Sequence, residues 1–246
     1  MKNRKIKLLS LFFDDLTFKE AADICIEAAI RKDKHFTVVT PNLEILLRAA
    51  YDTELKENIN NASLVVCDGA GVVLFSKIMS FFNCKKQKII REKIPGIDLG
   101  EEVLELAEKN NLSCFFLGGS ENTAKNAAKL LKERYKALTI GGYCNGYSEL
   151  KDADRLISKS DPDIVFVCLG SPLQEKTAHA LSGNRLYMCL GGSLDVWADN
   201  VKRAPLFMQK YGLEWLYRFY KQPQRILRSA KVFTRACAYI FIYNKI

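Results

Sequence analysis

The chain has 246 residues and a mass of 27.9 kDa, which suits one large domain or one domain with an appendage. Hydrophobic residues make up 48% of it, so a sizeable core is expected and wholesale disorder is excluded. The net charge of +9 is unevenly placed: residues from 202 onward contain ten Lys or Arg and one acid, whereas residues 1–201 contain 27 of each sign. This asymmetry predicts a core of residues 1–200 and a basic module of residues 201–246 that has an anionic partner.

The cysteines and histidines argue against a disulfide framework and a zinc site. None of the eight cysteines forms a C-x-x-C pair, and Cys67, Cys114, Cys168 and Cys189 lie within apolar, strand-like runs. The two histidines are far apart in the sequence, and we expect no bound metal. The N-terminal apolar run, from Ile6 to Phe13, is interrupted by polar residues, so it is interpreted as a first strand and not as a signal peptide. These features predict a reduced, cytoplasmic protein.

The first half of the chain alternates between strand and helix patterns. Thr17 and Glu20 form a capping box for a helix that extends to Ile30. After a strand at 36–39, Thr40 is a candidate N-cap and Pro41 suits the first position of the next helix. A strand at 64–67 leads into a helix that ends near residue 82. Residues 83–97 have no periodicity and form a basic loop, predicted to be mobile, after which Asp98 caps a helix over 99–109.

The second half continues the alternation. Strands are predicted at 113–117, 138–140, 164–169 and 186–190, and helices follow at 120–135, at 148–160 and after residue 172. The glycines at 141 and 142 are expected to end the second of these strands. Strict alternation of this kind predicts an α/β fold with a Rossmann-like, mostly parallel sheet and helices on both faces.

Several predicted strands end in small or polar residues at a helix start, where parallel sheets bind ligands. Gly118–Gly119 and Gly191–Gly192 would let backbone N–H groups approach a phosphate, or they simply turn the chain. Asp68 could act as a general base or cap the following helix. Gln174 could face a ligand, although Ser171 and Gln174 also match a capping box.

Two D-x-D patterns, at residues 152–154 and 161–163, resemble the metal-binding pairs of many glycosyltransferases. The second pair precedes its predicted strand, which places it at the opposite edge of the sheet from Asp68. The first pair lies in the opening turns of a helix, where acidic residues complement the helix dipole. Both positions favour structural roles over a metal site.

The basic tail is predicted to contain an amphipathic helix. Apolar residues recur at steps of three and four from Ile226 to Ile240, and Arg228, Lys231 and Arg235 recur on another face. Solvated, nucleic-acid-binding and lipid-binding faces all fit this pattern. A continuous apolar, aromatic face opposite the arginines favours an anionic membrane surface over nucleic acid, and packing in a homo-oligomer remains an alternative.

Seven short motifs occur in an order that resembles the WecG/TagA/CpsF family of bacterial glycosyltransferases. They begin at Val39-Thr40-Pro41-Asn42 and Asp68-Gly69-Ala70-Gly71, and continue through Ile94-Pro95-Gly96-Ile97-Asp98-Leu99 and Gly170-Ser171-Pro172-Leu173-Gln174-Glu175. The series ends with Gly191-Gly192-Ser193-Leu194-Asp195, Arg203-Ala204-Pro205 and Gly212-Leu213-Glu214-Trp215-Leu216-Tyr217-Arg218. The resemblance covers nearly the whole chain.

This resemblance implies an inverting, metal-independent transferase that needs no cofactor. It implies transfer of N-acetylmannosamine from its UDP donor to undecaprenyl-diphosphate N-acetylglucosamine, at the inner face of the membrane, with Asp68 as the base. The implied substrate-binding residues are Thr40, Asn42, Lys93, Gly118, Gly119, Tyr143, Gln174, Gly192, Asp195, Arg218, Arg225 and Arg228. The last three lie in the C-terminal appendage. The resemblance implies that this appendage folds over the active site.

Three alternatives remain open. Lys93 stands where the family usually has arginine, and Arg91 stands two positions earlier, so either residue could bind phosphate. The donor could instead carry glucose, N-acetylglucosamine or a uronic acid. From a different class, the chain could be a nucleotide-binding regulator with a nucleic-acid-binding tail.

Overall fold

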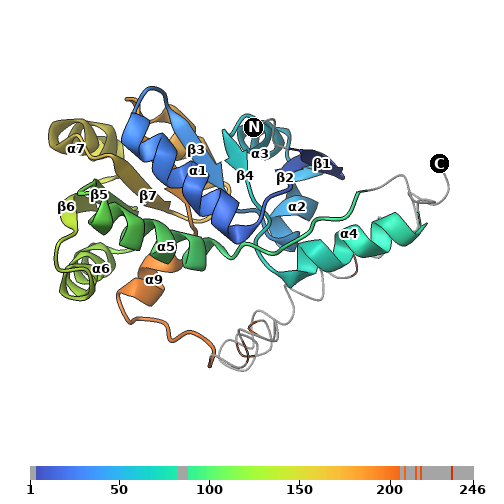
Figure 1. The fold of residues 1–246 in the computed structure, drawn as a ribbon. Helices are drawn as coiled ribbons and strands as arrows, with labels where there is room; N and C mark the ends of the chain where they lie inside the picture. The colour runs from blue at the N-terminus through green and yellow to red at the C-terminus, as the bar shows by residue number, and fades with distance from the viewer. Residues whose placement is uncertain are drawn as a thin grey trace.

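The computed structural model describes residues 4–82 and 88–205, together with the single residues Met208, Glu214, Tyr217 and Thr234. Six parallel strands form the central sheet in the order β4-β3-β8-β7-β5-β6 (Figure 1). Their bounds are β3 Phe36–Val39, β4 Leu64–Val65, β5 Ser113–Gly118, β6 Thr139–Cys144, β7 Ile164–Cys168 and β8 Leu186–Cys189. This sheet confirms the predicted α/β class.

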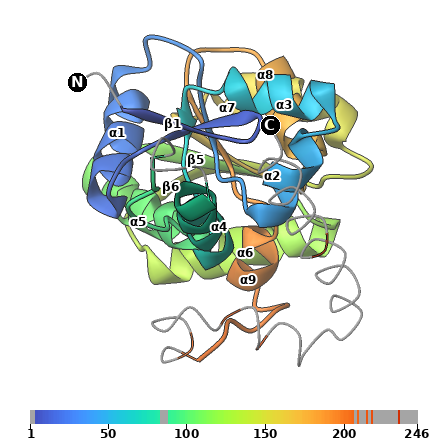
Figure 2. The same cartoon turned by 90° about the vertical axis from the view of Figure 1, so that its right-hand side faces the viewer.

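Helices cover both faces of the sheet (Figures 1 and 2). One face packs against α1 (Phe18–Arg31), α5 (Gly96–Lys109), α6 (Glu121–Arg134) and α9 (Ser193–Trp197). The other packs against α2 (Leu43–Ala49), α3 (Thr53–Asn60), α4 (Ala70–Phe82), α7 (Ala153–Ser160) and α8 (Leu173–Ala180). Alternate residues of β7 serve the two cores, with Val165 and Val167 in one and Phe166 in the other. A strand buried on both faces needs the continuous apolar run seen in the sequence.

The predicted first strand is instead a hairpin outside the main sheet. β1 (Lys5–Leu8) and β2 (Leu11–Asp14) pair antiparallel, and the chain reverses at Leu9, which has a φ of 52°. The carboxylate of Asp14 accepts the Val65 backbone N–H at 2.9 Å, which fixes the hairpin to β4. The polar residues at 7 and 10, which interrupt the apolar run, therefore mark the exposed face and the turn of a hairpin.

Capping explains where the structure agrees with or departs from the predicted helices. The Thr17–Glu20 capping box of α1 is confirmed in both directions. By contrast, Asp98 does not cap α5, which starts earlier, at Gly96. The Asp98 carboxylate instead lies 2.6 Å from the Arg203 guanidinium, so its charge joins α5 to the start of the appendage. Helix α3, which the sequence analysis missed, is capped by Asp52, whose carboxylate accepts the Leu55 N–H.

Two further boundaries differ from the predictions. Strand β6 continues through the glycines to Cys144, because Gly141 forms a bulge where the register against β5 shifts. Ser148 does not open α7. The Asn145 side chain organises a turn by accepting the backbone N–H groups of Tyr147 and Glu149, and a short 3-10 helix (η1, Leu150–Asp152) precedes α7.

Candidate active site

The carboxyl ends of the parallel strands meet at one edge of the sheet, which we call the ligand edge. Thr40, Asp68 and Gly119 follow β3, β4 and β5, and Gly170 and Gly192 follow β7 and β8. Neighbouring strands in this order are hydrogen-bonded, so residues distant in the sequence line up along this edge. In open parallel sheets this edge is where ligands bind.

Asp68 sits in the turn from β4 into α4. Its backbone N–H donates to the Pro41 carbonyl at 3.2 Å, and Gly69 turns the chain with a φ of +91°. The neighbouring thiol of Cys67 is buried; burial, and then the charge of Asp68, raises its pKa well above the ordinary value. Cys67 therefore stays a thiol at neutral pH, and Asp68, half-buried, places a carboxylate at the end of β4.

The structure separates the two candidates for phosphate binding. Arg91 forms ion pairs with Asp15 (3.2 Å) and Glu20 (3.6 Å), so its guanidinium holds the loop against the N-terminal segment. Lys93 lies next to Ile94, whose N–H donates to the Cys67 carbonyl at 2.7 Å. This bond brings the backbone around Lys93 alongside Asp68. The Arg91 side chain thus has structural partners, and Lys93 is the candidate whose backbone lies next to Asp68.

The sequence predicts Thr40 as the N-cap of α2, but Thr40 does not cap this helix. Its hydroxyl donates to the Cys189 carbonyl at 3.2 Å, which links the ends of β3 and β8. Asn42 caps the helix instead, and its side-chain oxygen accepts the Ile45 N–H at 3.0 Å. A Cβ at Gly96 would lie 2.8 Å from the Thr40 hydroxyl oxygen, so only glycine lets α5 start so close to this threonine.

Gln174 joins two turns of the ligand edge. Its side-chain oxygen accepts the Gly191 N–H at 2.8 Å, and its amide nitrogen donates to Glu175 at 3.0 Å. No side chain caps α8, so the capping-box interpretation of Ser171 and Gln174 is wrong. Because Gly191 already donates to Gln174, its N–H is not available for a phosphate.

Glu175, which the sequence analysis passed over, is an almost fully buried carboxyl beneath this turn, with 1% of its surface exposed. Burial raises its pKa, although the Gln174 hydrogen bond works in the opposite direction. Its place in the same short motif as Gln174 was the one available signal. The carboxyl fixes the orientation of the Gln174 amide, because the amide nitrogen needs an acceptor.

A cleft of about 240 Å³ opens between the ends of β5, β7 and β8. Among the predicted residues, Gly119, Gly192 and Asp195 line it. Its other lining residues are Gly146, Tyr147, Cys168, Leu169, Gly170, Leu173 and Gly191. A Cβ at Gly118 would lie 2.2 Å from the Cys168 carbonyl oxygen, so Gly118 allows β5 and β7 to approach each other below the cleft.

The tyrosine at this cleft is not the predicted one. Tyr143 lies within β6, paired in register with Phe116, and does not line the cleft. Tyr147, 80% exposed on the turn that follows β6, lines it instead. The Gly146 N–H donates to the Gly119 carbonyl at 2.9 Å, and this bond holds the turn against β5. The Gly141 bulge carries the strand past residue 143, and a substrate-binding role for Tyr143 stays a prediction.

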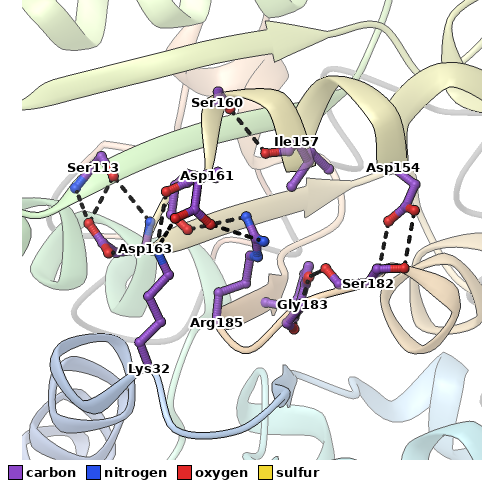
Figure 3. Close-up of polar contacts among 12 residues, drawn as sticks. Lys32, Ser113, Asp154, Ile157, Ser160, Asp161, Asp163, Ser182, Gly183 and Arg185 are labelled. Carbon is purple, nitrogen blue, oxygen red and sulfur yellow. Dashed lines mark hydrogen bonds and ion pairs between the residues drawn. The ribbon is translucent and has the colours of Figure 1, made fainter.

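The second D-x-D pair lies at the opposite edge of the sheet, in an ion-pair network (Figure 3). Asp163 accepts the backbone N–H and hydroxyl of Ser113 at 2.8 Å each, and the Lys32 ammonium lies 3.3 Å from its other oxygen. Lys32 and the buried Arg185 also pair with Asp161, at 3.1 and 3.3 Å. These partners join α1, β5, β7 and β8, so this pair is structural.

The two acids of the first D-x-D pair also have side-chain or backbone partners within the protein. Asp152 pairs with Arg155 at 3.3 Å, and Asp154 accepts the N–H and hydroxyl of Ser182. Among the described residues, no group of three or more His, Cys, Asp or Glu side chains is arranged around a common centre that could hold a metal ion.

The two histidines, His35 and His179, are distant in the sequence but close in the fold, with ring centroids 6.5 Å apart, and Tyr187 stacks on His35.

The predicted appendage is described only in part. Arg218, Arg225 and Arg228 lie outside the described residues. Arg203 is described and connects three acids: its guanidinium lies 2.6 Å from Asp98, 3.9 Å from Glu101 and 3.6 Å from Glu214. In the described part of the chain, no helix is both long and apolar enough to cross a membrane.

Comparisons with known proteins show the family of this chain. The profile of the glycosyl transferase WecG/TagA/CpsF family matches residues 6–244. An N-acetylglucosaminyldiphosphoundecaprenol N-acetyl-beta-D-mannosaminyltransferase from Bacillus spizizenii is 32% identical over 205 residues, covering 82% of this chain and 77% of its own. A protein of the same name from Staphylococcus aureus strain MRSA252 is 32% identical over 237 residues, covering 93% and 90%.

The chain therefore belongs to the WecG/TagA/CpsF family of glycosyltransferases. The family match confirms the resemblance inferred from the seven motifs and makes the protein an enzyme that transfers a sugar. It favours an enzyme over the alternative of a nucleotide-binding regulator.

Proposed function

We propose that this glycosyltransferase transfers N-acetylmannosamine from UDP-N-acetylmannosamine to N-acetylglucosaminyl-diphospho-undecaprenol. The observation that carries the proposal is the similarity to enzymes named for that transfer, which extends over 93% of this chain and 90% of the Staphylococcus aureus relative. A ligand edge with a carboxylate, a nearby lysine and a glycine-walled cleft supports it, because the reaction needs a base and a site for a diphosphate.

Asp68 is the proposed general base. Its carboxylate takes the proton of the acceptor hydroxyl as the hydroxyl oxygen bonds to the anomeric carbon of the donor. The bond between that carbon and the β-phosphate oxygen breaks, and UDP leaves with the electron pair. Attack opposite the leaving group inverts the anomeric centre. A base held within hydrogen-bond reach of the attacking hydroxyl typically contributes about 10²–10⁴-fold.

The leaving diphosphate is proposed to be stabilised by the protein and not by a metal ion or other cofactor. Helix α6 is capped by Ser120, next to the cleft-lining Gly119, and its positive dipole end favours an anion. Lys93, beside Asp68, supplies positive charge, and the tail arginines Arg218, Arg225 and Arg228 would add more. Preorganised donors of this kind stabilise developing charge without reorganisation.

Gln174 and Thr40 are proposed to shape the donor site. Gln174 fixes the Gly191–Gly192 turn at the cleft wall, and Thr40 fixes the end of β3 next to the end of β8. Asn42, Asp195 and Gly192 complete the proposed substrate-binding set. Asn42 is also the N-cap of α2, so its amide nitrogen is the part that can reach a ligand.

The test is UDP release from a panel of UDP-sugars in the presence of a short-chain N-acetylglucosaminyl-diphosphate lipid. We expect turnover with UDP-N-acetylmannosamine to exceed turnover with the glucose, N-acetylglucosamine and uronic acid donors by at least about 100-fold, since a polar pocket rejects mismatched hydroxyls strongly. Preferred turnover with another donor would contradict the proposed donor. Turnover that survives EDTA would support metal independence, and turnover abolished by EDTA and restored by a divalent cation would contradict it.

A further inference from the structure

Helix α4 is apolar on two faces, and only one of them is covered by the core. Val72, Phe75 and Met79 are at most 3% exposed and belong to the core beneath the sheet. On the other side, Leu74 and Phe81 are 58% and 83% exposed. An amphipathic surface helix normally carries polar residues on its outer face, so this face departs from the usual pattern.

Four residues define the exposed face, which we call the α4 stripe: Leu74, Lys77, Ile78 and Phe81. They are spaced at i, i+3, i+4 and i+7, so they share one side of the helix. Lys77 is exposed and Ile78 is partly exposed. The helix has 13 residues and is therefore about 20 Å long. Figure 1 shows it extending away from the sheet, with its C-terminal end farthest from the body.

The charges in the sequence of α4 and of the segment that follows it have one sign. Residues 69–90 contain four lysines, at 77, 85, 86 and 88, and no acidic residue, although residues 1–201 as a whole are neutral. The Ile90 N–H donates to the Ser76 hydroxyl at 3.3 Å, so the chain returns alongside α4. It brings Ile89, 44% exposed, and the exposed Lys88 close to the buried side of α4, where Ser76 lies.

The helix also starts at the ligand edge. Its first residue, Ala70, follows Asp68 and Gly69 directly. A flat surface placed against the α4 stripe would therefore extend from the projecting end of the helix towards the turn that contains Asp68. A lipid-linked diphosphate presents its head group at such a surface.

We propose that the α4 stripe is a membrane-contact surface that binds an anionic bilayer independently of the C-terminal tail. Leu74, Ile78 and Phe81 enter the interfacial region, and Lys77 contacts anionic head groups. Exposed apolar residues with lysines and no acids fit such an interface, and each lysine near it adds attraction that falls with salt. The inference deepens the proposed function, because it states how the enzyme reaches a membrane-held acceptor.

The first experiment is cosedimentation of the full-length protein with vesicles of phosphatidylcholine and phosphatidylglycerol. We expect the triple variant Leu74→Ser, Lys77→Glu, Phe81→Ser to lower the partition coefficient at least about tenfold. The matched control is Ile30→Ser, Lys19→Glu on α1, where Ile30 is 54% exposed and Lys19 is exposed. The control should bind like the wild type. Wild-type binding by the triple variant would overturn the inference.

A second measurement does not depend on how well the triple variant folds. The difference in tryptophan fluorescence between Phe81→Trp and the wild type should shift to the blue when these vesicles are added, since an indole at this position would leave water. Brominated lipid should quench this additional fluorescence. No shift and no quenching would overturn the proposal. A dimer in light scattering that the triple variant dissociates, together with unchanged vesicle binding by that variant, would also overturn the proposal.

Turnover separates this inference from the proposed function. With a water-soluble short-chain acceptor, the triple variant should keep wild-type turnover, because none of its substitutions reaches the cleft. With a long-chain acceptor in vesicles, turnover should fall with binding. If the wild type transfers no N-acetylmannosamine at all, the proposed function fails, while vesicle binding still decides the role of the α4 stripe.

Discussion

The two edges of the central sheet are built on different principles. At the ligand edge, five of the turns that follow strands contain glycine, and three of these glycines, Gly119, Gly170 and Gly191, have positive φ and line the cleft. At the opposite edge, Asp163 and its partners fill the space with hydrogen bonds and ion pairs (Figure 3). One edge keeps backbone open for a ligand, and the other closes the sheet.

The comparison shows that an acidic residue takes its role from the end of the strand at which it lies. Asp68 follows its strand and reaches the ligand edge, whereas Asp161 and Asp163 precede theirs and meet Lys32 and Arg185. The D-x-D spacing alone resembles a metal-binding pair of a glycosyltransferase. The direction of the strand, which the sequence already indicates, shows that the Asp161–Asp163 pair has a structural role.

The largest expected effect on stability is at the ligand edge, in Gly118→Ala. The new Cβ would lie 2.2 Å from the Cys168 carbonyl oxygen, which is backbone and cannot move without separating β5 from β7. We expect the free energy of unfolding to fall by about 4 kcal/mol or more. Urea denaturation measures it.

The matched control for that variant is Gly170→Ala. Gly170 also has a positive φ, +77°, but a Cβ there would meet nothing within 4 Å. The expected loss is about 1–2 kcal/mol, from the left-handed backbone alone. Equal losses in the two variants would contradict the close approach of β5 and β7.

At the opposite edge, Asp163→Asn should cost about 2 kcal/mol, because the lost carboxylate accepts two hydrogen bonds from Ser113 and pairs with Lys32. Asp161→Asn is the control and should cost less than about 1 kcal/mol, since its side chain is 67% exposed. Thermal or urea unfolding at neutral pH compares the two, and a larger loss for Asp161→Asn would reverse the assignment.

The pH dependence of the same site follows from its pKa. Burial alone would raise the pKa of Asp163, but the hydrogen bonds from Ser113 and the Lys32 ammonium outweigh it and lower the pKa. The charged form is thus favoured in the folded state. The stability gained is present above the ordinary pKa of about 4 and is lost as pH falls through the lowered value. Asp163→Asn should lack this acid-induced loss.

The smallest effect, of opposite sign, is expected for Glu175→Gln. Burial raises the pKa of Glu175, so ionisation opposes folding. The contribution of this carboxyl is complete below its ordinary pKa and is lost as pH rises through the raised value. Glutamine keeps the hydrogen-bonding shape without the charge, so the variant should gain up to about 1 kcal/mol relative to wild type between pH 4.5 and pH 8. Parallel unfolding curves at the two pH values measure it.

Local chemistry made much of the fold predictable. The Thr17 capping box, the buried apolar run of β7 and the glycine turns after β5, β7 and β8 each carry their structure in adjacent residues, and the structure confirms all three. The predictions failed where a distant partner decided the outcome. Thr40 donates to Cys189 instead of capping α2, and Asp98 pairs with Arg203 instead of capping α5.

The candidate site shows the same division. Strand direction alone placed Asp68, Gly119 and Gly192 at one edge. The ion pairs of Arg91 could not be predicted without the positions of Asp15 and Glu20, and the place of Tyr147 at the cleft could not be predicted without the bulge at Gly141. The sequence could not distinguish Gln174 from a helix cap. Its side-chain oxygen reaches the Gly191 N–H only when β7 and β8 are paired, and its amide nitrogen then donates to Glu175.

The measurement that tests the account most directly is turnover of Asp68→Asn, with UDP binding measured on the same preparation and Asp163→Asn as the control. We predict that Asp68→Asn binds UDP like the wild type and loses about 10²–10⁴-fold in kcat, whereas Asp163→Asn keeps turnover below its unfolding temperature. Near-normal turnover by Asp68→Asn would contradict its role as the base. A comparable loss in Asp163→Asn would contradict the division between the two edges.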